Sequence, residues 1–274
     1  MNKTVVIEKD NGVQIEQRDY SIQPLEVLSC GAGVQSSVLV LKVIEGLLPK
    51  PDLIIHSNTG SDLPYTYEQV DRLFKLATKH GIRFEVVRSH YGALHEAYMV
   101  NSSLPLAGQR SCTGRFKIDP INQRLRQIVG HGRGVVLVRS WLGISTDELT
   151  RRQPNKGLWV ENIFPLLDEL KMSRDDCSSY LNEYDRGYYA TSRSGCFCCP
   201  YGGKKHFRTL KKRYPDLFKI CLEMEALYFK NRPERIEGLC PGVRSLKAFD
   251  NNTLDQYGFD FVDVKCEPSG GCFL

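Results

Sequence analysis

One loop constrains the fold of this chain more than any other segment. Residues 29–37 read SCGAGVQSS, and they lie between an apolar run at residues 25–29 and a helical pattern that continues to residue 48. Gly31 and Gly33 allow close backbone approach or a positive φ angle, so the N–H groups of such a loop can converge on an anion. The loop is neither GxGxxG nor a Walker A motif. A tight turn without a ligand would have the same spacing, so the loop sequence alone does not distinguish a ligand-free turn from an anion-binding loop.

Strands and helices alternate along the first half of the chain. We expect further strands at residues 52–57, 83–87 and 134–140, a helix that carries Val70, Leu73, Phe74 and Ala77 on one buried face, and a helix at about residues 121–129. This alternation predicts an α/β fold with a doubly wound, mostly parallel sheet. Ligands of such sheets lie beyond the carboxyl ends of the strands. The 29–37 loop and a second loop at residues 57–64 both follow strands, so both are expected at that edge.

The chain is expected to divide near residue 150. Residues 1–150 form the predicted α/β core, preceded by a hairpin in residues 1–22, and residues 151–274 form a cysteine-rich helical cap and tail. A chain of 274 residues can also form one domain with a modest appendage. Helices are expected at residues 174–183, 204–214 and 215–231.

The chain contains ten cysteines. It has no apolar run of bilayer length and no apolar segment near its N-terminus, so we expect a cytoplasmic protein. In a reducing compartment, clustered cysteines indicate a metal, an iron–sulfur cluster or thiol chemistry. Cys196 and Cys199 form a C-x-x-C pair whose thiolates can reach one metal centre. Inert, buried cysteines are the alternative, which is more typical of scattered residues such as Cys177 or Cys221.

Five segments in order resemble the phosphoadenosine phosphosulfate (PAPS) reductase-like family of the adenine nucleotide α-hydrolase-like, or PP-loop, superfamily. They span residues 25–200 and read LSCGAGVQSSVLVLKV, HSNTGSDLPYTYEQVDRL, SCTGRFKIDPINQRL, RSWLGISTDELTRR and FPLLDELKMSRDDCSSYL. The resemblance implies a bound adenine nucleotide, ATP or PAPS. The residues that it assigns to nucleotide binding are Ser29, Gly31, Gly33, Gln35, Ser36, Ser37, Asn58, Thr59 and Gly60.

Two positions depart from the ATP-cleaving members of the superfamily. Gln35 stands where those enzymes carry an Asp, and Asn58 replaces the acid of the second loop. Both departures remove negative charge from the neighbourhood of the phosphates. They weaken the case for Mg–ATP hydrolysis without weakening the case for nucleotide binding.

The resemblance also places Cys112 beside the C-x-x-C pair as a third metal ligand. It implies a 4Fe–4S cluster held by Cys112, Cys196 and Cys199, with Cys198, Cys266 or Cys272 as the fourth ligand or with one iron left open. A structural zinc with four thiolates is the alternative.

Fixed cations are needed wherever a sulfate or phosphate is handled in a closed site. Arg115 and Lys117 flank Cys112, while Arg139, Arg151 and Arg152 bracket residues 143–149. These cations form a candidate anion clamp or lie on solvated helix faces.

In the tail, Cys266 and Cys272 are candidate catalytic thiols or a cover for the metal site. The candidate catalytic residues are therefore these two thiols, Cys266 and Cys272, and the cations Arg115, Lys117 and Arg151.

The sequence favours an adenine-nucleotide-binding PP-loop enzyme of sulfur chemistry. In the first form of this enzyme, a Cys-ligated iron–sulfur cluster is used to transfer sulfur to a nucleic-acid base or a small molecule. In the second form, the enzyme is a PAPS or adenylylsulfate reductase. A non-catalytic, zinc-containing module that binds nucleotide or nucleic acid is the third alternative. The basic stretch at residues 203–213 and the net charge of +5 suit tRNA or DNA, although a solvated helix has the same pattern. A thiol or sulfur donor is a further expected partner.

Overall fold

The computed structural model describes residues 22–131, 135–152, 157–184 and 195–250. The N-terminal hairpin expected in residues 1–22 and the tail cysteines Cys266 and Cys272 lie outside these residues, apart from Ile22. No helix in the described ranges is long and apolar enough to cross a lipid bilayer.

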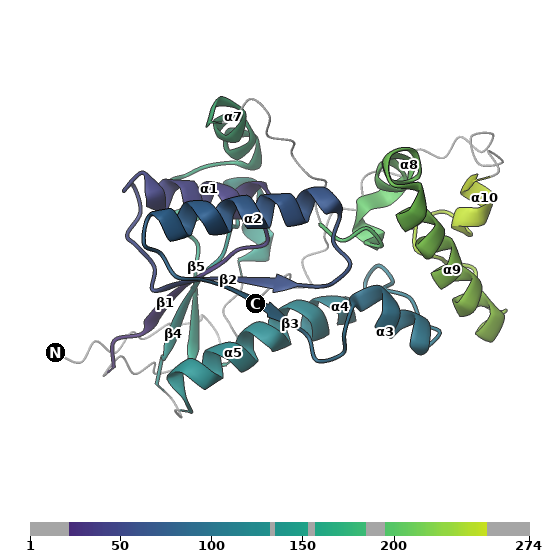
Figure 1. The fold of residues 1–274 in the computed structure, drawn as a ribbon, viewed down its shortest axis with the longest axis horizontal. Helices are drawn as coiled ribbons and strands as arrows, with labels where there is room; N and C mark the ends of the chain where they lie inside the picture. The colour runs from purple at the N-terminus through teal and green to yellow at the C-terminus, as the bar shows by residue number, and fades with distance from the viewer. Residues whose placement is uncertain (1–21, 132–134, 153–156, 185–194, 251–274) are drawn as a thin grey trace, which may run out of the picture.

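Five parallel strands form one sheet in the order β3-β2-β1-β4-β5 (Figure 1). They are β1 (Leu25–Ser29), β2 (Leu53–Asn58), β3 (Phe84–Arg88), β4 (Val138–Trp141) and β5 (Val160–Ile163). The predicted fold class, a doubly wound parallel α/β sheet, is therefore confirmed. Four of the strands lie where the sequence placed them, but β5 was not expected.

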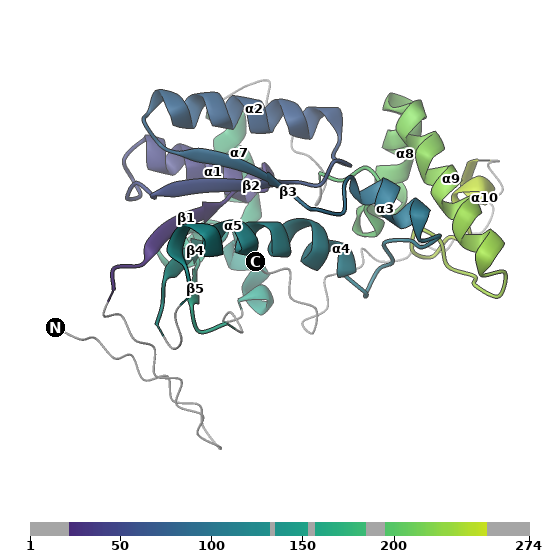
Figure 2. The same ribbon diagram turned by 60° about the horizontal axis from the view of Figure 1, so that its bottom comes forward.

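Helices cover both faces of the sheet (Figure 2). On one face lie α1 (Val34–Ile44), α2 (Pro64–Lys79), α6 (Pro165–Asp168) and α7 (Arg174–Tyr184), and on the other lies α5 (Asp119–Val129). Successive side chains of β1 point to opposite faces of the sheet, since Val27 packs with α5 while Leu28 packs with α1. Both side chains are fully buried, as expected for a sheet covered on both sides.

Residues 160–184 belong to this sheet assembly, since β5 pairs with β4 and α7 packs on α1. They lie beyond the division at residue 150 that the sequence suggested, and that division stays a prediction.

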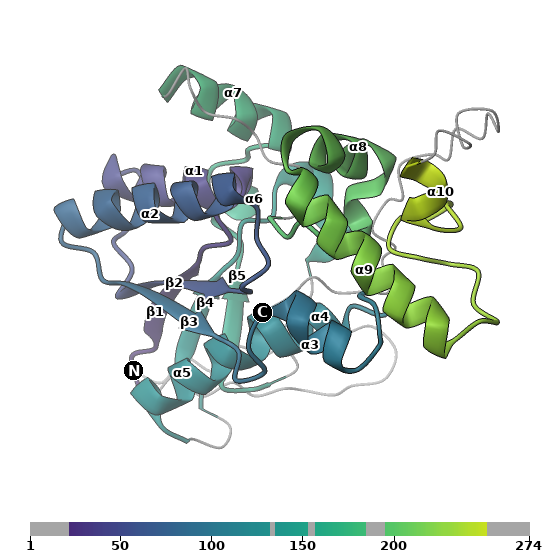
Figure 3. The same cartoon turned by 45° about the vertical axis from the view of Figure 1, so that its right-hand side comes forward.

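A second hydrophobic cluster gathers the C-terminal helices and α3 (Figure 3). Its helices are α3 (Leu94–Val100), α8 (Gly203–Arg213), α9 (Pro215–Asn231) and α10 (Leu246–Asp250). Cys196 and Cys198 are buried within it, so the cysteine segment joins this cluster to the sheet.

Glu225 is a buried carboxylate at the centre of this cluster. Its Oε1 accepts the backbone N–H of Leu239 at 2.7 Å and its Oε2 that of Leu246 at 2.6 Å. Burial raises the pKa of Glu225 to about 7, although the two N–H groups act in the opposite direction. Glu225 thereby ties the segment that leads into α10 to α9.

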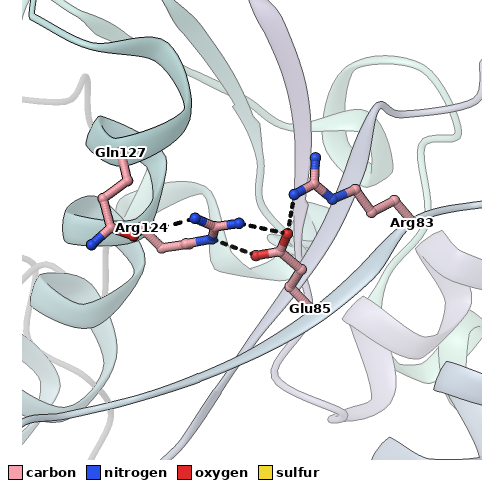
Figure 4. Close-up of polar contacts among 4 residues, drawn as sticks. All are labelled: Arg83, Glu85, Arg124 and Gln127. Carbon is pink, nitrogen blue, oxygen red and sulfur yellow. Dashed lines mark hydrogen bonds and ion pairs between the residues drawn. The ribbon is translucent and has the colours of Figure 1, made fainter.

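Ion pairs protect the exposed edge of the sheet at β3 (Figure 4). Arg124 of α5 donates from Nε and Nη2 to the two oxygens of Glu85, at 2.7 and 3.1 Å, and Arg83 also pairs with Glu85. The Arg124 hydrogen bonds are the main cause that lowers the pKa of Glu85. Charged groups on an edge strand discourage pairing with a strand of another molecule.

Candidate functional site

The 29–37 loop lies where the strand order reverses. The chain passes from β1 to β2 on one side, while β4 pairs with β1 on the other. Ligands of doubly wound sheets bind in the crevice at this position. Across it, Ser29 Oγ of β1 lies 3.4 Å from Ser140 Oγ of β4.

The first turn of α1 leaves backbone donors outside the helical ladder. The first intrahelical bond of α1 runs from Ser37 N to Gly33 O, at 3.0 Å, so the N–H groups of residues 34–36 precede the helical ladder. A Cβ atom added at Gly31 or Gly33 would meet no protein atom within 4 Å. The hydroxyl of Ser37 is buried and has no hydrogen-bond partner within the described ranges. These features make the 29–37 loop a candidate cradle for an anion.

Gln35 does not extend into that cradle as a free side chain. Its Nε2 donates to Glu148 Oε2 at 3.1 Å and to Ser145 Oγ at 3.4 Å, while its Oε1 accepts from Arg174 Nη1 at 3.0 Å. Glu148 Oε1 in turn accepts from Arg151 Nη1 at 2.6 Å. The loop is therefore tied to the segment after β4 and to the start of α7.

The segment after β4 differs from the capping box that residues 145–148 suggest. Ser145 precedes a 3-10 helix at Thr146–Arg151 but makes no side-chain cap to it. Glu148 instead forms the tertiary contacts just described. Gly143 packs closely there as well, because an added Cβ would lie 3.0 Å from Ser36 N.

The anion clamp expected from the sequence is only partly assembled. Arg139 pairs with Glu26 at 2.7 Å and Glu161 at 3.1 Å across neighbouring strands, so its charge is compensated within the sheet. Arg152 pairs with Asp168 on the surface, at 2.9 Å. Only Arg151 of these three joins the network at Gln35.

Arg174 joins that network too, and sequence reasoning missed it. It lies in the segment FPLLDELKMSRDDCSSYL, which carried no residue-level signal for a role at the 29–37 loop.

The second loop is shaped by its own side chains. Asn58 Oδ1 accepts the N–H of Gly60 at 2.8 Å, and Thr59 Oγ1 donates to Asp62 Oδ2 at 2.9 Å. Gly60 has a φ of 67°, and an added Cβ would lie 2.8 Å from the Cβ of Ala93. Asn58 and Thr59 therefore hold the turn at the end of β2, where a nucleotide is expected.

A short antiparallel bridge joins this second loop to the cysteine segment. Asp62 pairs with Cys196, flanked by bonds from Leu63 N to Gly195 O at 2.7 Å and from Phe197 N to Ser61 O at 2.9 Å. The Cys196 thiol donates to Asp62 Oδ1 at 3.4 Å.

Thr59 Oγ1 also lies 3.3 Å from the sulfur of Cys196. The first cysteine of the C-x-x-C pair thus reaches the edge of the sheet. Sequence reasoning missed Asp62, whose only signal was an acid beside the Asn-Thr-Gly turn.

Lys117 brings a cation to the same place. It lies on a π-helical turn at Gly114–Ile118, which follows the short helix Ser111–Thr113 that carries Cys112. Such turns are frequent at functional sites. Burial lowers the pKa of Lys117, but Cys196, Asp62, Cys199 and Cys112 together raise it above its usual value.

Arg115, in contrast, is exposed and lies over the ring of Tyr91, 5.6 Å from its centroid. Lys117 therefore lies among the thiols, and the role assigned to Arg115 stays a prediction.

The expected metal ligands lie near one another. Cys112, Cys196, Cys198 and Cys199 all lie in or against the second hydrophobic cluster, and Cys196 also contacts Asp62. Burial is the main cause that raises the pKa of Cys196 and Cys198 well above its usual value, and neighbouring cysteines add to it. Within the described ranges, no three Cys, His, Asp or Glu side chains are arranged to hold a metal ion. The assignment of these cysteines to an iron–sulfur cluster or a zinc ion therefore stays a prediction.

Comparisons with known proteins give one related sequence. No family model matches the chain. An uncharacterized protein of Methanocaldococcus jannaschii is 26% identical over 273 residues, covering 91% of this chain and 60% of that protein. The chain thus spans less than two thirds of its relative's length.

Three solved structures are similar to the chain. A PAPS reductase from Candida auris, in a phosphate complex, has a TM-score of 0.42 and 15% identity, covering 61% of this chain and 75% of that one. The U34-tRNA thiolase NcsA from Methanococcus maripaludis, with its 4Fe–4S cluster, has a TM-score of 0.40 and 14% identity, covering 80% and 74%. An NH3-dependent NAD synthetase from Campylobacter jejuni, with nitrate, has a TM-score of 0.37 and 14% identity, covering 77% and 89%.

At these TM-scores we base the function on the residues of this chain.

Proposed function

We propose that this chain is an adenine-nucleotide-binding enzyme of sulfur chemistry. The nucleotide phosphates lie on the 29–37 loop, and the reacting sulfur is handled at the thiols beside Lys117. The observation that carries the proposal is the bridge between Asp62 and Cys196, because it joins the edge of the nucleotide site to a thiol.

The chemistry of the site supports both activities considered from the sequence. Lys117 places a positive charge beside thiols and the Asp62 carboxylate, where an anionic sulfur group needs neutralising. In the transferase form, ATP adenylates a carbonyl group and incoming sulfur displaces AMP. In the reductase form, a thiolate attacks the sulfur of PAPS and displaces adenosine 3′,5′-bisphosphate, and a second thiol then releases sulfite and forms a disulfide with the first. We favour the transferase form, with a nucleic-acid base or a small molecule as acceptor.

Nucleotide binding is tested by two glycine variants. Gly31→Ala and Gly33→Ala are each expected to weaken binding of AMP about tenfold or more, because the methyl group enters the space that the N–H donors face. Protein stability is expected to change by less than about 1 kcal/mol, since the methyl meets no protein atom. Calorimetry and urea unfolding measure the two quantities.

Gly114→Ala is the matched control for these variants. Its added Cβ also meets no protein atom within 4 Å, and its φ of −58° suits alanine, but it lies outside the loop. Unchanged AMP affinity in both loop variants would contradict the phosphate cradle.

The sulfur activity is tested on protein purified without oxygen. Iron, sulfide and zinc are measured first, followed by the affinities for ATP, AMP and PAPS. Release of AMP and pyrophosphate from ATP with an acceptor supports the transferase form, whereas release of sulfite from PAPS with a thiol supports the reductase form. Binding of none of the three nucleotides would contradict the proposed function.

A further inference from the structure

Gln35 occupies a position that needs both a hydrogen-bond donor and an acceptor. Its NH2 group donates to the carboxylate of Glu148, and its carbonyl oxygen accepts from the guanidinium of Arg174. A carboxylate at this position could not donate and would lie against Glu148, whereas a cation would lie against Arg174. The departure from Asp at this position therefore has a structural cause, which is the connection to residues 145–151 and to α7.

The connection brings two arginines close to the first turn of α1. Arg151 and Arg174 both reach the network from other elements, separated from Gln35 by more than a hundred residues. Glu148 already binds Gln35 and Arg151 with its two oxygens. Within the described ranges, the guanidinium of Arg174 donates to the neutral amide of Gln35, and Asp147, which accepts the backbone N–H of Arg174, also interacts with its charge.

Two buried donors near this place also have no partner. The Nε of Arg151 and the hydroxyl of Ser37 are both buried without a hydrogen-bond acceptor in the described part of the chain. Ser37 is only 1% exposed and lies in the first turn of α1, next to the anion cradle. Buried donors without partners are rare in native proteins, so an acceptor supplied by a ligand explains them.

We propose that Arg174 is a specificity-determining residue for the anionic group that a nucleotide carries beyond its α-phosphate. Gln35 positions Arg174, and Arg151 assists from the other side of Glu148. The pyrophosphate of ATP and the sulfate of PAPS share this chemistry, since both place oxyanion charge there. The proposal rests on the nucleotide site of the proposed function and names what that site discriminates.

Arg174→Gln is the first test, with AMP, ATP and PAPS as probes. The variant is expected to bind AMP within about twofold of the wild type. It is expected to bind ATP or PAPS at least tenfold more weakly, which equals about 1.4 kcal/mol, and the probe that is weakened identifies the group. Arg126→Gln is the matched control. Arg126 lies over the ring of Trp159 near the end of α5, which leads to the amino end of β4, whereas the 29–37 loop follows the carboxyl end of β1.

The positioning role of Gln35 is tested by placing a carboxylate on Arg174. Gln35→Glu replaces the neutral amide with a charged group that compensates the charge of Arg174 and lies against Glu148. It is expected to weaken ATP or PAPS binding at least tenfold, while AMP binding stays within about twofold of the wild type. Adding Glu148→Gln removes the repulsion but leaves the carboxylate on Arg174, so the double variant is expected to recover little of the affinity for ATP or PAPS.

The outcomes separate this inference from the proposed function. Wild-type protein that binds no nucleotide overturns both. Wild-type protein that binds AMP, with Arg174→Gln weakening all three nucleotides equally or none, overturns this inference and leaves the nucleotide site standing. Full recovery of ATP or PAPS affinity on adding Glu148→Gln overturns the role of Gln35 as the neutral partner of Arg174.

Discussion

Replacing Asp62 with alanine is expected to lower the free energy of unfolding by about 2–4 kcal/mol. The change removes the acceptor for the hydroxyl of Thr59 and for the thiol of Cys196. It also removes the carboxylate nearest to the thiols from the surroundings of Lys117, whose charge then lies beside fewer compensating groups. Asp62→Asn keeps the size of the side chain and is expected to lower the free energy of unfolding by a smaller amount. Urea unfolding measures both variants.

Glu68→Ala is the control for Asp62→Ala. Glu68 is an exposed acid in the first turns of α2, so its removal changes the net charge equally and is expected to alter stability by less than about 0.5 kcal/mol. Equal stability of the two variants would mean that Asp62 does not hold the cysteine segment at the sheet edge.

A second large effect is expected at Glu225. Glu225→Ala leaves the N–H groups of Leu239 and Leu246 without their acceptor in a buried place and opens a cavity beside them. Such losses cost about 3–5 kcal/mol in total. Glu223→Ala, two residues earlier on the exposed side of α9, is expected to have little effect.

Glu225 also predicts how stability depends on pH. Its pKa in the folded protein is about 7, above its ordinary value of 4.5, so between these values the folded state binds more protons than the unfolded state. The contribution of Glu225 to stability is therefore largest at acid pH and falls as the pH rises from 4.5 to 7, by at most about 1.4 kcal/mol per unit.

The nontitrating variant Glu225→Gln isolates this contribution. The difference in unfolding free energy between wild type and Glu225→Gln is expected to decrease as the pH rises across that window. A difference that stays constant or increases would show that folding does not raise the pKa of the Glu225 carboxyl group.

The sequence allowed the central sheet to be predicted because apolar runs and helical periodicity are local signals. The strands β1, β2 and β3 are rich in apolar residues and are followed by small or polar loops, so each could be recognised from a few residues. The strand β5 reads VENI and has only one fully buried residue, Val160, so its pattern did not reveal it. Its place in the sheet comes from pairing with β4.

The candidate site could be predicted only where its residues follow one another in the chain. The 29–37 loop and the Asn58 turn are local, and their spacing was informative. The partners of Gln35 and Cys196 were not predicted, because Glu148 lies 113 residues from Gln35 and Asp62 lies 134 residues from Cys196. Arg139 had the same local pattern as Arg151, and only the neighbouring strands reveal that its charge is already compensated.

These long separations bear on the order in which the protein is completed during synthesis. The 29–37 loop emerges early from a ribosome, but β4, Glu148, Arg174 and the bridge at Cys196 are all made later. Contacts between distant segments form slowly, because the intervening chain loses entropy before they are gained. Growing chains that end before residue 140 would therefore carry the glycines of the loop without the neighbours that complete it. The proposed nucleotide site is then completed late, after the sheet has received its fourth strand.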